Sequence, residues 1–338
     1  MKKIYLLLIT AFLTLPWASK LEAQATYYSK AAATDFNDVN TWGTAADGTG
    51  TAPASISTAD SFVVQNNSIL TLTADAGIRY LTINAGTLNV SANTLTVEVP
   101  TQNNSKIVVT TGGQLNLSGG NIICNGAVYF ANGSGFNQSG GLLKIDPNSG
   151  TAATSIGGAG NTAAKTFGIG YGADGVATST LTPASNVAKF TLTGGSIQIV
   201  DPPLTTSTSA YSVAVHTGTA LNFGTGHTVK FGDGISTQAA GSANGFYVYM
   251  FQGSSFGVLG NIEVDVLTGT NRWVKTLNSV GILGNLNIVS GEIWNTSTLY
   301  VNGNIMNNGI FTIGSVLYFG SYLNAIAAAS ANAQTVTG

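Results

Sequence analysis

The residues with the best spacing for catalysis are two acids, Glu263 and Asp265, at alternate positions of a predicted strand. Alternate residues of a strand share a face and lie about 6.6 to 7 Å apart along it. That distance overlaps the roughly 6.5 to 9.5 Å between the carboxyl groups of inverting glycosidases. Arg272, Trp273 and Lys275 follow, and would supply cations and a ring for sugar stacking. The cluster is therefore a candidate site for a β-helical polysaccharide hydrolase or lyase.

A structural role for the same acids is the simpler interpretation, and we favour it. Ile262, Val264 and Val266 alternate with the two acids. Because successive side chains of a strand point to opposite faces, these three would form the core face and leave Glu263 and Asp265 in solvent. We therefore predict no catalytic residues and a protein that is not an enzyme.

The chain offers few ligands for a metal ion or a cofactor. Its two histidines, His216 and His227, lie near no cysteine or carboxylate at metal-ligand spacing. Asp146–Gly150 and Gly232–Gly234 hold too few acids for the several oxygens that calcium takes, and we interpret both as ordinary turns. Cys124 is the single cysteine, so no disulfide can form within the chain. We expect neither a metal site nor a cofactor.

Two surface patterns are candidates for binding a ligand without catalysing a reaction. Thr-x-Thr pairs resemble the flat threonine arrays of ice-binding solenoids, but they are scattered, whereas such an array needs a pair on nearly every coil. The pairs are Thr71 and Thr73, Thr94 and Thr96, Thr191 and Thr193, and Thr335 and Thr337. Trp42, Trp273 and Trp294 could stack on sugars, although we expect each to pack in a cap or fill a gap.

These residues are positioned by a short pattern that the chain repeats. A glycine or Gly-Asn corner precedes a strand with alternating apolar residues, at a spacing in the twenties and without a helical period. The clearest copies are Ala85–Val90, Gly112–Leu117, Gly140–Ile145, Gly194–Ile199 and Gly284–Ile288. Such recurrence predicts an all-β fold, a right-handed parallel β-solenoid (β-helix), over residues 61–338.

The alternation assigns a core face and an outer face to each strand. The residues expected to point inward begin with Leu70, Leu72, Leu81, Ile83, Leu95 and Val97, and end with Phe311, Ile313, Leu317 and Phe319. Charged residues make up 8% of the chain, against about 25% in average domains. On strands stacked about 4.8 Å apart, like charges would repel along the stack, whereas hydroxyls and amides can hydrogen-bond. With a formal net charge of −2 and no basic cluster, we expect no nucleic-acid partner.

Three stretches depart from the repeat. Residues 26–60 carry Tyr27, Tyr28, Phe36 and Trp42 among turn residues, which predicts an N-terminal cap over the open end of the stack. Thr151–Ala184 is rich in Gly, Ala and Thr and predicts a long side loop. Asn324–Ala333 is rich in alanine but has no amphipathic stripe, so we favour a loop over a helix.

The first 25 residues have the form of a secretory signal peptide. Lys2 and Lys3 precede the apolar run Ile4–Trp17, and Ala23-Gln24-Ala25 supplies a small-x-small cleavage site. The run is shorter than the about 18 to 20 apolar residues of a membrane span. We expect export with cleavage near Ala25 and no membrane span in the mature chain.

The end of the chain resembles the repeat of large surface proteins exported by type nine secretion. Those repeats run G-N-x-x-N-x-G-x-F, then G-x-V-x-F, then Q-x-[IV]-x-G, and the matching residues are Val301–Phe319 and Gln334–Gly338. The leader of such proteins is similar to Tyr27–Ser29, Thr41–Gly43, Asp47–Gly50 and Ser61–Gln65. Members usually end in a small β-sandwich sorting domain, and none follows Gly338, so we expect the polypeptide to be longer.

The resemblance implies an adhesin or a surface scaffold of a Gram-negative bacterium. Our leading hypothesis is a non-enzymatic solenoid, secreted or at the outer cell surface, that serves as an adhesin stalk or structural scaffold. The alternatives are a β-helical polysaccharide-degrading enzyme and a carbohydrate-binding surface without catalysis. The expected partners are extracellular glycans or the surface of a host or neighbouring cell.

Overall fold

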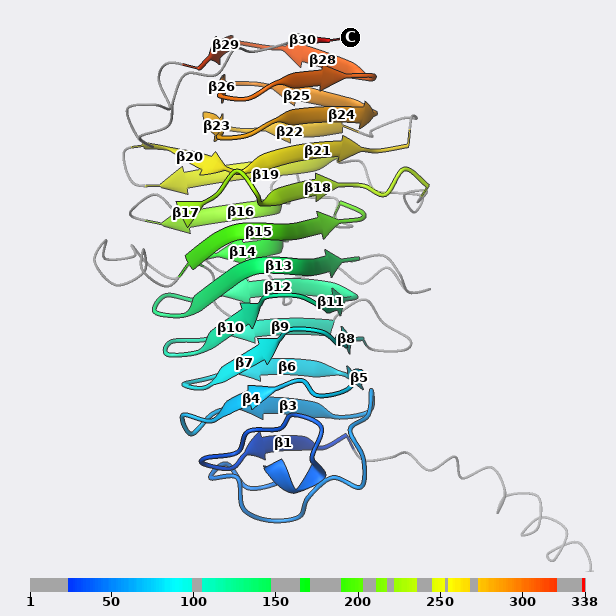
Figure 1. Ribbon diagram of the computed structural model, residues 1–338, viewed down its shortest axis with the longest axis vertical. Helices are drawn as coiled ribbons and strands as arrows, with labels where there is room; N and C mark the ends of the chain where they lie inside the picture. The colour runs from blue at the N-terminus through cyan, green and yellow to red at the C-terminus, as the bar shows by residue number, and fades with distance from the viewer. Residues whose placement is uncertain are drawn as a thin grey trace, which may run out of the picture.

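Successive coils of the chain stack into one long column, with the N-terminal end at the bottom and the C-terminal end at the top (Figure 1). The computed structural model describes residues 24–98, 105–146, 165–170, 190–202, 211–217, 222–235, 245–252, 255–267, 273–320 and 336–337. Nearly all of the predicted signal peptide, residues 1–25, therefore lies outside the described residues. So do Arg272 and the alanine-rich Asn324–Ala333.

Two parallel sheets run the length of the column, and in the described residues they contain 16 and 14 strands. The first sheet consists of β1 (Thr26–Ser29), β2 (Trp42–Gly43), β3 (Ser61–Val64), β6 (Tyr80–Ile83), β9 (Ser105–Val109), β12 (Gly126–Phe130), β14 (Lys165–Ile169), β16 (Tyr211–Thr217), β19 (Phe246–Gln252), β20 (Ser255–Leu259), β22 (Trp273–Thr276), β23 (Val280–Ile282), β25 (Glu292–Asn295), β26 (Thr298–Val301), β28 (Ile310–Ile313) and β29 (Val316–Phe319).

The second sheet consists of β4 (Ile69–Thr71), β5 (Ala76–Ile78), β7 (Thr87–Val90), β8 (Thr94–Val97), β10 (Gln114–Leu117), β11 (Asn121–Cys124), β13 (Gly135–Ile145), β15 (Phe190–Ile199), β17 (Asn222–Phe223), β18 (Thr228–Phe231), β21 (Asn261–Asp265), β24 (Leu286–Ser290), β27 (Ile305–Asn307) and β30 (Val336–Thr337). Among described strands, only the β1–β2 and β19–β20 pairs are antiparallel. The predicted all-β parallel β-solenoid is confirmed.

The core is built from the apolar half of each alternating strand. In β6, Leu81 and Ile83 are fully buried while Tyr80 and Thr82 are partly exposed, and most other short strands repeat this pattern. Inward residues of neighbouring coils lie in register, as Leu88 does with Leu115. Each such side chain contributes roughly 1.5 to 3 kcal/mol of burial, so the column is stabilised coil by coil.

Polar ladders cover the outside, as the low charge predicts. Asn116 donates its Nδ2 to Oδ1 of Asn89 at 2.8 Å, and Asn137 donates its Nδ2 to Oδ1 of Asn116 at 3.2 Å. The three asparagines occupy matching positions of β7, β10 and β13. Neutral amides thus bond from coil to coil at a spacing where carboxylates would repel one another.

The repeated Gly-Asn corner has a specific packing reason. Oδ1 of Asn261 accepts the backbone N–H of Asn285 at 2.8 Å, and Oδ1 of Asn285 accepts that of Asn304 at 2.9 Å. A Cβ on Gly303 would lie only 2.6 Å from Oδ1 of Asn285. Glycine is therefore needed before asparagine because the amide of the coil below fills the space of a side chain.

The N-terminal segment forms the predicted cap. Phe36 and Trp42 have no exposed surface, and both rings contact Phe62 of the first full coil. The 3-10 helix η2 (Val39–Thr41) turns the chain so that Trp42 enters the core. Nε1 of Trp42 donates to the carbonyl oxygen of Phe36 at 2.9 Å, so the buried indole has its partner.

Two expectations need correction. Thr151–Ala184 is not wholly a side loop, because its residues 165–169 form β14, which pairs with β12 and β16 inside the first sheet; the remainder of that range, apart from Gly170, lies outside the described residues. Phe319 and Ile313 were expected in the core, yet they are 42% and 48% exposed. They hold inward register positions, but no described strand pairs with the far side of β28 or β29.

Candidate functional site

The two candidate acids lie on the outer face of β21, where neighbouring coils engage both of them. Oε1 of Glu263 forms an ion pair with Nζ of Lys230 at 2.8 Å, and its Oε2 accepts from Nδ2 of Asn287 at 3.4 Å. Oδ1 of Asp265 accepts from Oγ of Ser290 at 2.9 Å. Both acids occupy outward positions of β21, as the structural interpretation predicts, and in addition they bond to side chains of neighbouring coils.

The structure does not gather the predicted catalytic set. Glu263 and Asp265 belong to the second sheet, whereas Trp273 and Lys275 lie on β22 of the first sheet. Arg272 lies outside the described residues. The acids and the proposed sugar ring thus belong to different sheets, although they are close in sequence.

His227 is buried in the core at the corner before β18. Its Nε2 lies 3.1 Å from Oε1 of Gln138, and because an amide oxygen only accepts, Nε2 is the donor. Gln138 is fixed in turn by donating Nε2 to the carbonyl oxygen of Ser196 at 2.9 Å. Burial lowers the pKa of His227 from 6.5 to about 4, so the ring is neutral near pH 7.

His227 belongs to no metal centre of the described residues. No three His, Cys, Asp or Glu side chains gather closely enough there to hold an ion. His216 belongs to β16, opposite Phe251 of β19 in register. In the Gly232–Gly234 turn, Oδ1 of Asp233 accepts the backbone N–H of Ile235 at 3.0 Å, which is a local turn contact. The Asp146–Gly150 turn is described only at Asp146.

The three threonine pairs within the described residues do not form an array, and Thr335 of the fourth pair lies outside those residues. Thr71 lies opposite Asn89 in register, and Thr191 lies opposite Asn137 and Asn222. Thr94 and Thr96 of β8 face Asn121 and Ile123 of β11. Where one strand has threonine, the matching position of the next strand thus holds another residue. These pairs therefore supply no repeating flat surface.

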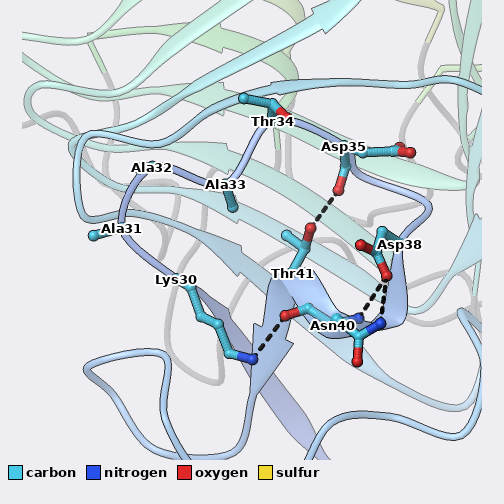
Figure 2. A pocket seen from close by; sticks show the side chains of 9 residues that line it. All are labelled: Lys30, Ala31, Ala32, Ala33, Thr34, Asp35, Asp38, Asn40 and Thr41. Atoms are coloured by element: carbon cyan, nitrogen blue, oxygen red, sulfur yellow. Dashed lines mark hydrogen bonds between the residues drawn. The ribbon is translucent and has the colours of Figure 1, made fainter.

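A hollow of about 260 Å³ lies in the N-terminal cap (Figure 2). Its polar groups bond to one another: Nζ of Lys30 donates to the carbonyl oxygen of Asn40 at 2.7 Å, and Oδ1 of Asp38 accepts the backbone N–H of Asn40 at 2.9 Å. Oγ1 of Thr41 donates to the carbonyl oxygen of Asp35 at 2.6 Å. The hollow is explained by the bonds that shape the cap.

A second hollow, of about 270 Å³, lies over β3, β6 and β9 on the first sheet. Tyr80 and Lys106 are among the residues that line it. Neither hollow is lined by a residue that the sequence singled out for catalysis or metal binding.

The surface that best fits ligand binding is a group of side chains on the outer face of β19, β22, β25 and β28, called here the aromatic patch. Its six members are Tyr247, Trp273, Lys275, Glu292, Trp294 and Thr312. Trp294 is 37% exposed, and the others are partly exposed. Tyr247, Lys275, Trp294 and Thr312 are register partners from one strand to the next. Trp273 and Glu292 form a second pair of register partners, two residues away on the same face.

Ring and cation contacts hold the patch together. The ring centroids of Tyr247 and Trp273 lie 4.9 Å apart, and those of Trp273 and Trp294 lie 6.3 Å apart. Nζ of Lys275 lies 4.3 Å from the ring centroid of Trp294 and 5.7 Å from that of Trp273. Burial also raises the pKa of Tyr247, so its phenol stays protonated and can donate.

Two glycines leave room for the indoles. A Cβ on Gly245 would lie 2.7 Å from Cδ2 of Trp273, and a Cβ on Gly314 would lie 3.1 Å from Nε1 of Trp294. The backbone therefore closely approaches both indoles. Trp273 and Trp294 therefore lie over glycines on the outer face and remain partly exposed, whereas Trp42 packs in the cap with no exposed surface.

Sequence reasoning missed Tyr247, Glu292 and Thr312 as neighbours of the tryptophans. The signal for their orientation was present, because Val248, Val274 and Ile293 take the inward positions of the same strands.

Comparisons with protein-family models, with curated proteins and with solved structures found no match for this chain. A search of the described residues for a helix long and apolar enough to cross a membrane found none.

Proposed function

We propose that this chain is a non-enzymatic β-solenoid that serves as an adhesin stalk or structural scaffold, secreted or at the outer surface of a Gram-negative bacterium. The observation that carries the proposal is the unbroken parallel pairing from β4 to β30 in the second sheet. A stack in which each coil contacts only its neighbours gains length by adding coils. Length combined with a neutral, ladder-bonded outside suits a spacer.

A coil deletion tests the stalk. Thr87 and Gln114 are register partners, and the backbone N–H of Gln114 donates to the carbonyl oxygen of Gly86. Deleting residues 87–113 joins Gly86 to Gln114 as Gly113 is joined to it now. We expect a folded protein whose longest dimension, measured by small-angle X-ray scattering, falls by one strand spacing of about 4.8 Å.

A deletion one residue longer is the matched control. Removing residues 87–114 joins Gly86 to Leu115 and shifts the next strand by one position, which turns its apolar residues outward. The longer deletion should unfold or aggregate. If both deletions unfold the whole protein, the coils are not independent modules and the stalk proposal fails.

Export is supported by the charged and apolar leader pattern and by the resemblance to type nine cargo. N-terminal sequencing of protein recovered from the surface of a type nine-competent host should find a start near Thr26. An uncleaved protein that stays in the cytoplasm would contradict the proposed location.

The enzyme alternative has a direct test at the two acids. Purified protein should not degrade any member of a polysaccharide panel. Turnover that disappears in Glu263→Gln or Asp265→Asn would establish a hydrolase or lyase and overturn the non-enzymatic assignment.

A carbohydrate-binding surface without turnover is a second candidate, and the aromatic patch favours it. Exposed tryptophan beside a cation is the residue combination that sugars contact, and it occurs here on a rigid sheet and not on a loop.

A further inference from the structure

We propose that the aromatic patch binds a neutral polysaccharide of hexopyranoses with equatorial hydroxyl groups, by stacking one sugar ring on the indole of Trp294. This inference rests on the carbohydrate-binding candidate and deepens it, because it names the ligand class and the contact residues. It leaves the stalk role of the column unchanged.

The stacking contact is assigned to Trp294 from exposure and ring geometry. Trp294 is 37% exposed, while Trp273 and Tyr247 are less exposed. The ring planes of Trp273 make angles of 89° with Tyr247 and 79° with Trp294, so the three rings do not form one flat platform. A pyranose with equatorial hydroxyls has an apolar face of axial C–H groups, which matches the exposed apolar surface of one indole.

The polar groups beside Trp294 match the rim of such a sugar. Lys275 carries three donors and no acceptor, and ionised Glu292 only accepts. Hydroxyl groups can do both, so one sugar can bond to each. In the described residues, Lys230–Glu263 is the one pair within ion-pair distance, so no carboxylate there pairs with the ammonium of Lys275. Glu292 Oε1 accepts from Oγ1 of Thr312 at 2.7 Å, which fixes its carboxylate.

Charge balance selects a neutral ligand. The patch holds one cation, Lys275, and one anion, Glu292, so its formal charge is zero. A uronic acid would gain attraction from Lys275 and meet repulsion from Glu292 on the neighbouring strand. A neutral sugar avoids the desolvation of a carboxylate near Glu292.

Position along the column predicts how a chain would lie. Tyr247, Trp273 and Trp294 come from the adjacent strands β19, β22 and β25. An oligosaccharide aligned with the column would therefore pass more than one ring, so affinity should rise with chain length.

Calorimetric titration with cellohexaose tests the proposal on the whole protein. We expect binding that Trp294→Ala weakens by at least about tenfold, which corresponds to about 1.4 kcal/mol. Lys275→Met and Glu292→Gln should each weaken it several-fold, because each loses bonds to hydroxyl groups. Cellobiose should bind more weakly than cellohexaose, and added sodium chloride should leave the affinity unchanged.

The matched control is Lys144→Met, which removes a cation from the outer face of the second sheet and should not alter binding. Circular dichroism checks that each variant stays folded. Three results would overturn the inference: no binding of cellohexaose, unchanged binding by folded Trp294→Ala, or tighter binding of oligogalacturonate. The 87–113 deletion lies far along the chain from the patch, so a failed stalk with intact binding, or the reverse, separates the two proposals.

Discussion

In the described residues, the core is covered at the N-terminal end of the column and partly exposed at the C-terminal end. At the N-terminal end, Phe36 and Trp42 have no exposed surface and close the stack over Phe62. At the C-terminal end, Ile313 and Phe319 keep inward positions but are 48% and 42% exposed. Among the described residues, therefore, a dedicated cover exists at one end only.

The difference between the two ends shows that the direction in which a side chain points and the extent of its burial have separate causes. Phe311 is in register with Ile293, and both face inward, yet only Ile293 is fully buried. A strand's own sequence decides which face a side chain takes, and the next coil decides whether that side chain leaves water. Solenoid stability is consequently a property of neighbouring pairs of coils.

The largest expected effect tests the closed end. Trp42→Ala should lower the free energy of unfolding by about 3 to 5 kcal/mol, because it empties a fully buried site in which the indole contacts Phe36 and Phe62. Phe319→Ala should cost roughly 1 kcal/mol or less, since nearly half of that side chain is already in water. Urea unfolding of both variants measures the difference, and equal losses would refute the contrast between the ends.

The pH dependence of stability tests His227, a buried residue in the middle of the column. Because the folded pKa of His227 is about 4 and the unfolded value is 6.5, the unfolded chain binds more protons between these pH values. The contribution of His227 is complete above pH 6.5, falls as the pH drops towards 4, and changes by about 3 kcal/mol in all.

The matched variant for this prediction is His227→Gln, which keeps a donor near Gln138 and removes the titration. Its unfolding free energy should depend less steeply on pH than that of the unchanged protein between pH 6.5 and 4. Parallel curves for the two proteins would show that His227 is not responsible.

A smaller effect on stability is expected at two glycine corners, one in each half of the column. Gly303→Ala should cost about 1 to 3 kcal/mol, because its methyl group would collide with the carbonyl oxygen of Gly284 and, at 2.6 Å, with Oδ1 of Asn285. Gly86→Ala should cost less, since the nearest atom, Cγ1 of Val64, is 3.0 Å away. Hydrogen exchange should speed up at the Asn304 amide in the first variant only. Unchanged exchange there would mean that the amide ladder does not depend on glycine.

The smallest effect on stability concerns the exposed residues of β28 and β29. Ile310→Lys and Val316→Lys replace outward residues that are 60% and 41% exposed, and each should change the unfolding free energy by about 0.5 kcal/mol or less. No described strand pairs with the far side of β28 or β29, and charge at such an edge opposes strand addition, so any concentration-dependent self-association should fall. Sedimentation velocity measures it, with Thr82→Lys on an interior strand as the control that changes nothing. Association that persists in both edge variants would assign it to another surface.

Much of the fold was predictable from single residues. Leu81 and Ile83 alternate with polar neighbours, which was enough to place them inside, and the aromatics of residues 26–60 were enough to predict a cap. The same alternation, applied to Val274 and Ile293, would have placed Trp273 and Trp294 outside. What the sequence could not give was the neighbour of each tryptophan.

That neighbour depends on coil length. Thr87 and Gln114 pair across 27 residues, whereas Asn285 contacts Asn304 across 19. With coils of unequal length, no constant period predicts that Lys275 meets Trp294 or that Glu292 lies beside Trp273. The site is therefore a product of register, and register is set by loops and corners that lack a fixed repeat.

The ladder of Asn89, Asn116 and Asn137 has a consequence for where such a column can be used. Amide-to-amide bonds carry no net charge, so dissolved ions have little to screen or displace. Strands held in this way should keep their alignment equally in dilute water and in brine. This insensitivity to ionic strength suits a molecule that is exposed to varying salt concentrations.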